Sequence, residues 1–318
     1  MKEYSTIIHL GMPKTATTAF QNLLFARHSQ VHYLGKFAEK DVPKPVHTAL
    51  LMRQRRPKPV EYDGILSADL GDQLAYCDEH DLKPVLSKEG LSNGSYLRKF
   101  QQALLFRRKF GKCKIIFFIR EPVSFTQSFY AEMLKSFQLR TRKRGWMLAL
   151  PPAPYYFDIN QYMELAAQPG KVLMQYLKVA DTASVYARIF GRKNVKIYIF
   201  EEFSRQPEKT ILTLCRDIGI DSAEALELMG QKRANDRITT GYVQRLKEIQ
   251  ASSELTRIFQ EMNPKQRREM LQPSNTGEKI SPQLSPKWIN IIENLGIKQN
   301  RRLVKDWNLP LEDYGYPL

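Results

Sequence analysis

The stretch Ser5-Thr-Ile-Ile-His-Leu-Gly-Met-Pro-Lys-Thr-Ala-Thr-Thr-Ala-Phe-Gln-Asn-Leu-Leu-Phe25 predicts the start of an α/β fold. Residues 6–10 are apolar and rich in β-branched side chains, which is typical of a strand buried on both faces. Gly11 and Pro13 interrupt this pattern. Residues 19–24 then follow helical spacing and give one apolar stripe. The members of this stripe are Phe20, Leu23 and Leu24.

The turn between this strand and this helix is rich in polar donors. A glycine-containing turn from a strand into a helix directs unpaired backbone N–H groups at one place, and the helix dipole adds positive potential there. One lysine and three hydroxyl groups stand in the same turn, namely Lys14, Thr15, Thr17 and Thr18. The pattern predicts an anion-binding loop, with an ordinary strand-to-helix turn capped by threonine as the alternative.

This loop is not a Walker A loop, because that motif has a glycine directly before its lysine, whereas Pro13 stands before Lys14 and Gly11 lies three positions away. The segment Gly11-Met-Pro-Lys-Thr-Ala-Thr-Thr-Ala-Phe-Gln21 resembles the 5′-phosphosulfate loop of sulfotransferases that use 3′-phosphoadenosine 5′-phosphosulfate (PAPS), which reads Gly-x-Pro-Lys-Thr-Gly-Thr-Thr. Ala16 stands where the family usually has glycine, and we expect it in the first helical turn, where no positive φ is needed. The resemblance implies that the donor is bound by Gly11, Pro13, Lys14, Thr15, Ala16, Thr17 and Thr18.

A second motif follows the clearest strand of the sequence, residues 113–120. Pro122 suits the first position of a helix, so Arg120 lies at the carboxyl tip of the strand. An ATPase would be expected to place a magnesium-binding aspartate there, whereas an arginine indicates direct pairing with phosphate. The segment resembles the family's 3′-phosphate motif, Arg-x-Pro-x-x-x-x-x-Ser-x-Tyr, which implies that Arg120 and Ser128 bind the 3′-phosphate.

Two residues are candidates for acid–base chemistry. Residues 83–89 predict a second strand whose carboxyl end brings Glu89 to the edge where the Lys14 loop lies. Ser-Lys-Glu here is similar to the strand end of many sulfotransferases, in which a glutamate deprotonates the acceptor. A surface acid or a cap of the helix predicted at residues 91–106 is the alternative for Glu89. His9, on the first strand, is a candidate for substrate contact, with a core histidine as the favoured alternative.

Two basic segments and a helical region complete the chain. The run Arg53-Gln-Arg-Arg56 is predicted to be a solvated loop or a contact for an acidic acceptor. Residues 138–158 combine basic, aromatic and proline residues, which suits an acceptor platform or lid, a nucleic-acid contact or a plain surface insertion. Arg233 is predicted, from its position alone, to lie in a loop that closes over the nucleotide.

Helices are predicted towards the end of the chain at 242–260, 286–295 and 298–306. We expect this tail to pack on the sheet. Residues 1–318 would then form a single domain, with the basic and aromatic insertion at about 138–158 and a helical C-terminal extension at about 240–318.

Composition limits the functional classes. The chain has 318 residues, 42% of them hydrophobic, and 49 Lys and Arg against 33 Asp and Glu, which gives a net charge of +16. Such a surplus suits an anionic cofactor, an acidic polymer, nucleic acid or a membrane surface. We expect reduced thiols at Cys77, Cys113 and Cys215, no metal, and a soluble cytoplasmic protein, because no CxxC pair, zinc-ligand spacing, leader or long apolar run occurs.

The resemblance covers two motifs and the rhythm of residues 1–220. It implies a three-layer, P-loop-kinase-like α/β fold with a central parallel sheet flanked by helices. It also implies metal-free transfer of a sulfuryl group from PAPS to a hydroxyl or amine, with Lys14 stabilising the leaving phosphate and Glu89 accepting the proton. The basic surface favours an anionic or carbohydrate acceptor, such as a bacterial surface glycan or its lipid-linked precursor, and allows a peripheral membrane contact. A nucleotide or small-molecule kinase and a non-catalytic nucleic-acid-binding protein are the alternatives.

Overall fold

The computed structural model describes residues 6–35, 61–136, 156–231 and 238–318. It contains two compact units. The first unit comprises Met1–Glu121, Lys178–Lys232 and Gln299–Gly315, and the second comprises Pro122–Leu177, Arg233–Lys298 and Tyr316–Leu318. The predictions for Arg53–Arg56, for Arg233 and for nearly all of the 138–158 insertion lie outside the described residues. The expectation of a single domain stays a prediction.

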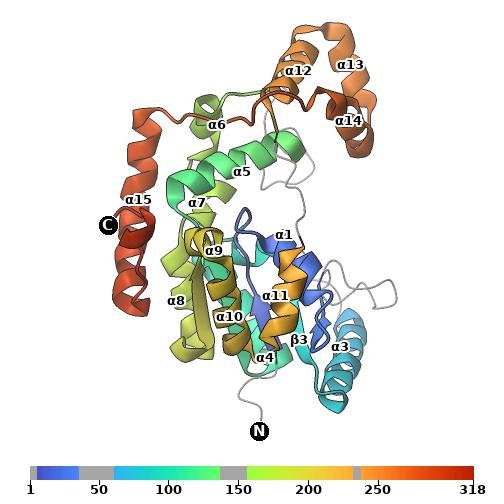
Figure 1. Ribbon diagram of the computed structural model, residues 1–318, viewed down its shortest axis with the longest axis vertical. Coiled ribbons are helices and arrows are strands. Elements are labelled where there is room, and N and C mark those ends of the chain that lie inside the picture. The colour runs from blue at the N-terminus through green and yellow to red at the C-terminus, as the bar shows by residue number, and fades with distance from the viewer. Residues whose placement is uncertain (1–5, 36–60, 137–155, 232–237) are drawn as a thin grey trace. The chain divides into compact units, whose positions relative to one another are not determined.

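A parallel sheet forms the centre of the first unit (Figure 1). Its strand order among the described residues is β2-β3-β1-β4-β5, and every neighbouring pair is parallel. The strands are β1 (Thr6–His9), β2 (Val31–Tyr33), β3 (Lys83–Ser87), β4 (Cys113–Ile119) and β5 (Val195–Ile199). Because β1 lies between β3 and β4, the loop that follows it opens at the middle of the carboxyl edge of the sheet.

Helices cover both faces of this sheet, which confirms the predicted fold class (Figure 1). One face is covered by η1 (Phe20–Phe25), α10 (Pro207–Ile218) and α11 (Ser222–Gly230). The other face is covered by α4 (Tyr96–Phe110) and α8 (Val179–Phe190), which pack against each other. All seven residues of β4 are buried, as expected for a strand between two helical layers.

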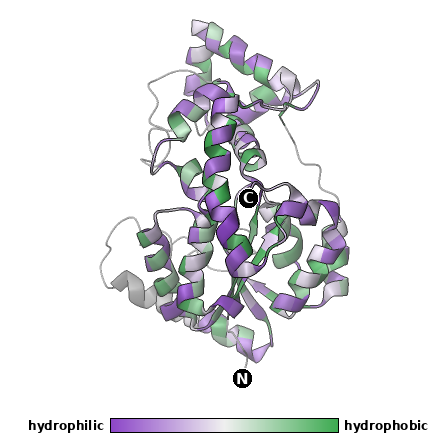
Figure 2. Cartoon of the chain, turned by 90° about the vertical axis from the view of Figure 1, so that its left-hand side faces the viewer, coloured by the Kyte–Doolittle hydropathy of each residue, from purple (hydrophilic) through white to green (hydrophobic). Residues whose placement is uncertain are grey.

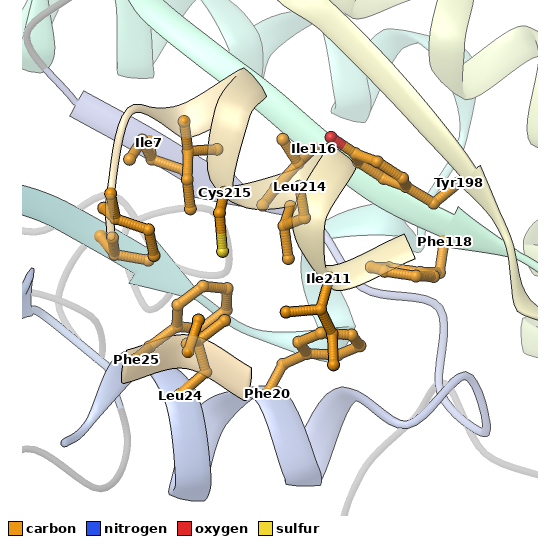
Figure 3. Close-up of a cluster of buried hydrophobic side chains, with 14 of the residues drawn as sticks. Ile7, Phe20, Leu24, Phe25, Ile116, Phe118, Tyr198, Ile211, Leu214 and Cys215 are labelled. Atoms are coloured by element: carbon orange, nitrogen blue, oxygen red, sulfur yellow. The ribbon is translucent and has the colours of Figure 1, made fainter. Parts of the chain in front are cut away.

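An aromatic core anchors the helix after the Lys14 loop to the sheet (Figure 3). The ring of Phe118 on β4 stacks on Phe20 at a centroid distance of 4.7 Å and on Tyr198 at 5.0 Å. Burial of such a side chain stabilises the fold by about 1.5–3 kcal/mol. The core also contains Ile7, Leu24, Phe25, Ile116, Ile211, Leu214 and Cys215.

The helix after the loop changes type along its length. It begins as α1 (Thr17–Ala19) and continues as the π-helical η1, in which the Ala26 N–H donates to the Gln21 carbonyl at 3.1 Å. The predicted apolar stripe is buried, which confirms the predicted helical face. Single π turns are frequent at functional sites.

The remaining elements of the first unit lie around this centre. They are α3 (Glu61–Glu79), η2 (Glu89–Ser92), η4 (Arg192–Asn194), α9 (Phe200–Arg205), the final turns of α15 (Pro286–Trp307) and η6 (Glu312–Tyr314). The helix α15 is continuous, so the prediction of two separate helices at 286–295 and 298–306 is wrong. A single interior glycine, Gly296, is tolerated within a helix and does not end it.

The second unit is helical in its described residues. Its helices are α5 (Pro122–Ser136), α6 (Ile159–Ala166), α7 (Val172–Tyr176), α12 (Thr240–Ala251), α13 (Ser253–Glu261), α14 (Pro264–Leu271), η5 (Gln272–Ser274) and the first turns of α15. Phe125 and Phe129 of α5 stack at 5.5 Å and both contact Tyr176. Most helices carry hydrophilic and hydrophobic residues together, as helices with one buried side do (Figure 2). Within the described ranges, no helix is both long and apolar enough to cross a bilayer.

Candidate active site

The ends of four neighbouring strands meet at one edge of the sheet. In the register of the sheet, His9 of β1 pairs with Ser87 of β3, and Ile119 of β4 pairs with Ile199 of β5. Because all strands are parallel, the segments that follow them start at the same carboxyl edge. These segments contain Gly11, Glu89, Arg120 and Phe200 within their first two residues. The structure therefore brings the predicted donor loop, the predicted base and the predicted phosphate-binding arginine to one edge.

The backbone of the donor loop, residues 11–18, is unusual. Three of its residues have left-handed conformations, with φ of 52° at Gly11, 67° at Lys14 and 60° at Ala16. Left-handed residues that alternate with right-handed ones turn successive N–H groups to one side and form a concave anion-binding nest. The helix α1 starts directly after this nest, so its unpaired N–H groups add to the same potential.

Ala16 corrects one expectation. It is the N-cap residue of α1 with φ 60° and ψ 14°, and not a residue of the first helical turn, where we expected it. The cause is the loop geometry, because the nest requires a left-handed residue between Thr15 and Thr17. For a residue with a Cβ atom this conformation costs about 1–2 kcal/mol, whereas glycine adopts it freely. The chain therefore carries local strain at the position where the motif that it resembles has glycine.

The threonine hydroxyls brace the loop from within. Thr15 Oγ1 donates to the Met12 carbonyl at 2.7 Å, and Thr17 Oγ1 donates to the same carbonyl at 2.8 Å. Both side chains are buried, whereas Thr18 is exposed. A hydroxyl has one proton to donate, so in this conformation neither buried threonine donates its hydroxyl proton to an anion. The loop offers instead its backbone N–H groups, Lys14 and the exposed hydroxyl of Thr18.

Arg120 holds the loop from the tip of β4. One guanidinium nitrogen, Nη1, donates to the Lys14 carbonyl at 2.9 Å, and the guanidinium carbon lies 4.7 Å from the centroid of the Phe200 ring. The ring of Phe200 supports the flat cation from the end of β5. Arginine carries five N–H groups, and the contact with Lys14 uses one of them. Arg120 thus fixes the carbonyl of the left-handed Lys14 and brings positive charge to the loop.

Glu89 opens a short turn that is bonded to the loop. It is the first residue of η2 and is half-buried. The Lys88 N–H donates to the His9 carbonyl at 3.2 Å, and Ser92 Oγ donates to the Gly11 carbonyl at 2.5 Å. The α4 helix starts later than predicted, at Tyr96, and its N-cap side chain is Ser95. Glu89 therefore does not cap α4, which removes one of the two structural alternatives for this residue.

Residues 5–295 match the family model described as the sulfotransferase domain. The chain belongs to the sulfotransferase domain family. The predicted family membership is thereby confirmed over nearly the whole chain.

Several solved structures are similar to this sulfotransferase-family chain at low identity. One is a sulfotransferase from Alicyclobacillus acidocaldarius, with 17% identity, 84% of this chain and 94% of that chain covered, and a TM-score of 0.45. Another is the sulfotransferase domain of the Synechococcus PCC 7002 olefin synthase, with 13% identity, coverage of 91% and 93%, and a TM-score of 0.43. A mouse sulfotransferase complexed with PAP has 14% identity, coverage of 93% and 85%, and a TM-score of 0.43. No curated protein sequence matches the chain.

His9 of this sulfotransferase-family protein lies in the core. Its side chain is fully buried, and its Nδ1 atom lies 2.7 Å from Ser87 Oγ, which also accepts from Gln21 Nε2 at 3.0 Å. The ring packs edge-on against Phe25 at 5.4 Å. Burial lowers the pKa of His9 to about 3, so the ring is neutral at physiological pH. These surroundings favour the structural alternative that the sequence left open.

Ser128 and Tyr130 belong to the second unit. Both lie on α5, where Ser128 is half-buried and Tyr130 is buried. The Tyr130 hydroxyl donates to the Phe157 carbonyl, and burial raises the pKa of this phenol above its ordinary value. Tyr130 therefore anchors the backbone at Phe157 rather than titrating. The contact of Ser128 with a 3′-phosphate stays a prediction.

Within the described ranges, neither a metal-binding group nor the cavity described below belongs to the candidate active site. There, no group of three or more His, Cys, Asp or Glu residues is arranged to hold a metal ion. A cavity of about 280 Å³ is lined by residues that include Arg192, Lys196 and Trp307. It lies at the amino end of β5, whereas the donor loop lies at the carboxyl edge of the sheet, so it is not part of this site.

Three contacts of the site escaped the sequence prediction. Ser92 donates a hydrogen bond to the Gly11 carbonyl of the loop, and the Phe200 ring packs against the Arg120 guanidinium. Gln102 donates to the Leu91 carbonyl at 3.0 Å. Phe200 is the last residue of a strand that the apolar run at residues 194–200 predicts, so its place near the edge was available from the sequence. Ser92 and Gln102 gave no such signal, because their spacing matches no motif and both fell inside the helix predicted at residues 91–106.

Proposed function

We propose that this protein transfers a sulfuryl group from PAPS to a hydroxyl or amine of a carbohydrate or glycolipid in the cytoplasm. The observation that carries the proposal is the contact between Arg120 and the Lys14 loop. It joins two cationic residues, Lys14 in the loop after β1 and Arg120 at the carboxyl tip of β4, and both strands belong to one sheet. Two cations on separate strands suit a donor with two separated phosphate groups better than a single triphosphate tail.

The roles in donor binding follow from the loop. Backbone N–H groups from Lys14 to Thr18 bind the 5′ phosphosulfate, with the Thr18 hydroxyl as a further donor. Gly11 and Pro13 fix the entrance of the loop, and Thr15, Ala16 and Thr17 act through their backbone. Arg120 binds the 3′-phosphate together with Ser128, and Arg233 closes over the nucleotide, the last two roles resting on the sequence motif and position alone.

The chemistry is a displacement at sulfur. The acceptor oxygen or nitrogen attacks the sulfur atom, its bond to sulfur forms, and the bond between sulfur and the bridging oxygen of the 5′-phosphate breaks. The electron pair of that bond stays on the phosphate, and Lys14 stabilises the developing charge. The acceptor's proton passes to the Glu89 carboxylate. Sulfated acceptor and 3′-phosphoadenosine 5′-phosphate leave, and no step is assigned to a metal.

The acceptor is inferred from charge. The net charge of +16 favours an acceptor that carries carboxylate, phosphate or sulfate groups. An acidic carbohydrate combines such anionic groups, which the basic surface would bind, with hydroxyl groups that can accept the sulfuryl group. Two of the basic segments of the chain, around Arg53–Arg56 and Arg140–Arg144, lie outside the described residues, and their contact with the acceptor rests on sequence alone.

A transfer assay tests this function. Purified protein is incubated with sulfur-labelled PAPS and a panel of neutral and acidic saccharides, glycolipids and amines, with the Lys14→Ala variant as the inactive control. We expect label on an acidic or amphiphilic carbohydrate only with the wild-type protein. Transfer of phosphate from γ-labelled ATP to any member of the panel, with none from PAPS, would show a kinase instead. Retention of a nucleic acid on filters with a steep salt dependence, without transfer of either label, would favour the binding protein.

A further inference from the structure

The Glu89 turn, residues 88–92, contacts the donor loop through a buried serine. Ser92 Oγ lies 2.5 Å from the Gly11 carbonyl oxygen and 3.1 Å from the Glu89 carbonyl oxygen. The single hydroxyl proton favours the shorter contact. Ser92 is buried, with only 3% of its surface exposed. One side chain therefore links the first residue of the donor loop to the turn that begins with Glu89.

The backbones of the two segments also touch. A Cβ atom on Gly11 would lie 2.9 Å from Thr17 Cγ2 and 3.4 Å from the Cα atom of Glu89, and Gly11 has a φ of 52°. A glycine is needed there both for the left-handed conformation and for the close approach. The donor loop and the backbone of Glu89 thus pack without a side chain between them.

The far side of the turn is held by helices of the same unit. Gln102 Nε2, on α4, donates to the Leu91 carbonyl at 3.0 Å and lies 2.8 Å from the Tyr186 hydroxyl of α8. Only 1% of Gln102 is exposed. Removing one buried hydrogen bond costs about 1–3 kcal/mol, so these contacts define the place of the turn. Ser92 is the member of this set that reaches the donor loop.

We propose that Ser92 is a positioning residue for the transfer reaction, which acts by holding Glu89 at a fixed place relative to the donor loop. The proposal rests on the function proposed for Glu89. In-line transfer needs the acceptor between the carboxylate and the sulfur atom, and a misplacement of about 1 Å costs about 10²-fold in rate. Ser92 touches neither donor nor acceptor in this proposal and acts only through the Glu89 turn.

The first test separates turnover from donor binding. We expect Ser92→Ala to lower kcat by about 10–100-fold, while the dissociation constant of 3′-phosphoadenosine 5′-phosphate changes less than about threefold. Ser92→Cys fills the space of the serine side chain, so it leaves no cavity, but it donates a hydrogen bond only weakly. It should lose less kcat than Ser92→Ala. Ser95→Ala removes the N-cap hydroxyl of α4 nearby and is the matched control for lost stability. A normal kcat in Ser92→Ala, or an equal loss in Ser95→Ala, would overturn the proposal.

A double-mutant cycle tests whether Ser92 acts through Glu89. In the Glu89→Gln background, Ser92→Ala should lower kcat by less than about threefold more, because the group that it positions no longer accepts the proton. A loss that multiplies the two single effects would contradict the proposal and leave the base role of Glu89 intact. An active Glu89→Gln variant would overturn both the base role of Glu89 and the positioning role of Ser92. That outcome is read from the single variant alone, so it is distinguished from a failure of the Ser92 proposal by itself.

Discussion

The donor loop and the Glu89 turn follow adjacent strands of one sheet, yet they are held in different ways. The loop is shaped by its own backbone, with left-handed residues at Lys14 and Ala16 and two threonines bonded to the Met12 carbonyl. The Glu89 turn has no left-handed residue and takes its place from buried side chains, chiefly its own Ser92 and Gln102 of α4.

This difference separates two kinds of sensitivity to mutation. A loop made of backbone N–H groups tolerates changes in most of its side chains, as long as the left-handed positions are kept. A turn placed by buried side chains loses its position when one hydrogen bond is removed. We therefore expect donor affinity and catalytic rate to respond to different residues, although the two segments are in contact.

The largest effect is expected for Glu89→Gln, which changes the turn and leaves the loop intact. The amide keeps the size of the side chain but cannot accept the acceptor's proton. We expect turnover to fall by about 10²–10⁴-fold, with bisphosphate affinity and melting temperature unchanged. The control is Glu227→Gln, at an exposed position on α11. Steady-state kinetics decide the outcome, because turnover within a few-fold of wild type would exclude Glu89 as the base.

Lys14→Ala is expected to have the next largest effect, and it tests the loop. Its loss removes the cation that faces the developing charge on the leaving phosphate, so kcat should fall by about 10²–10³-fold. The backbone nest persists, so bisphosphate affinity should fall much less. Calorimetry and single-turnover kinetics on one preparation measure both. A large loss of affinity with an unchanged kcat would assign Lys14 to ground-state binding alone.

Arg120→Ala should affect both donor binding and turnover. The arginine supplies a charge for the 3′-phosphate and a hydrogen bond to the Lys14 carbonyl. We expect bisphosphate affinity to weaken by about 2–3 kcal/mol, as for a charge-assisted contact, and kcat to fall because the loop is less well held. Arg120→Lys keeps the charge but not the fork, and should restore affinity only in part. Unchanged affinity in Arg120→Ala would remove the 3′-phosphate assignment.

The smallest effect concerns strain in the loop. Ala16→Gly should raise the stability of the protein slightly, because the left-handed conformation costs alanine about 1–2 kcal/mol, and the greater freedom of unfolded glycine offsets about 0.4–1 kcal/mol of this. Ala19→Gly, at a helical position with φ −66°, should lower stability by about 1 kcal/mol. Chemical denaturation of both variants compares the same substitution in two conformations. A destabilisation of equal size in both would show that Ala16 is not strained.

Much of the fold was readable from the sequence because the strands are short apolar runs. The predicted strands at residues 6–10, 83–89 and 113–120 correspond to β1, β3 and β4, and parallel pairing then fixed which residues share an edge. Local patterns also identified the donor loop. The apolar stripe after it predicted which side of the helix is buried.

The details that failed depend on contacts between distant residues. The left-handed conformation of Ala16 could not be predicted, because alanine on its own favours the first turn of a helix. The start of α4 moved to Tyr96 because Ser95 supplies the cap and residues 89–92 form a separate turn. The bond between Arg120 and Lys14 joins residues more than a hundred positions apart, and no local pattern encodes it.

The most direct test of the account is a calorimetric titration of the wild-type protein with 3′-phosphoadenosine 5′-phosphate and, separately, with ATP and Mg²⁺. The central claim is that Lys14 and Arg120 recognise two separated phosphate groups. We predict that the bisphosphate binds far more tightly than ATP, and that at one hundred times its dissociation constant it stabilises the protein by about 2.7 kcal/mol. Equal affinity for the two ligands, or tighter binding of ATP with Mg²⁺, would contradict the account.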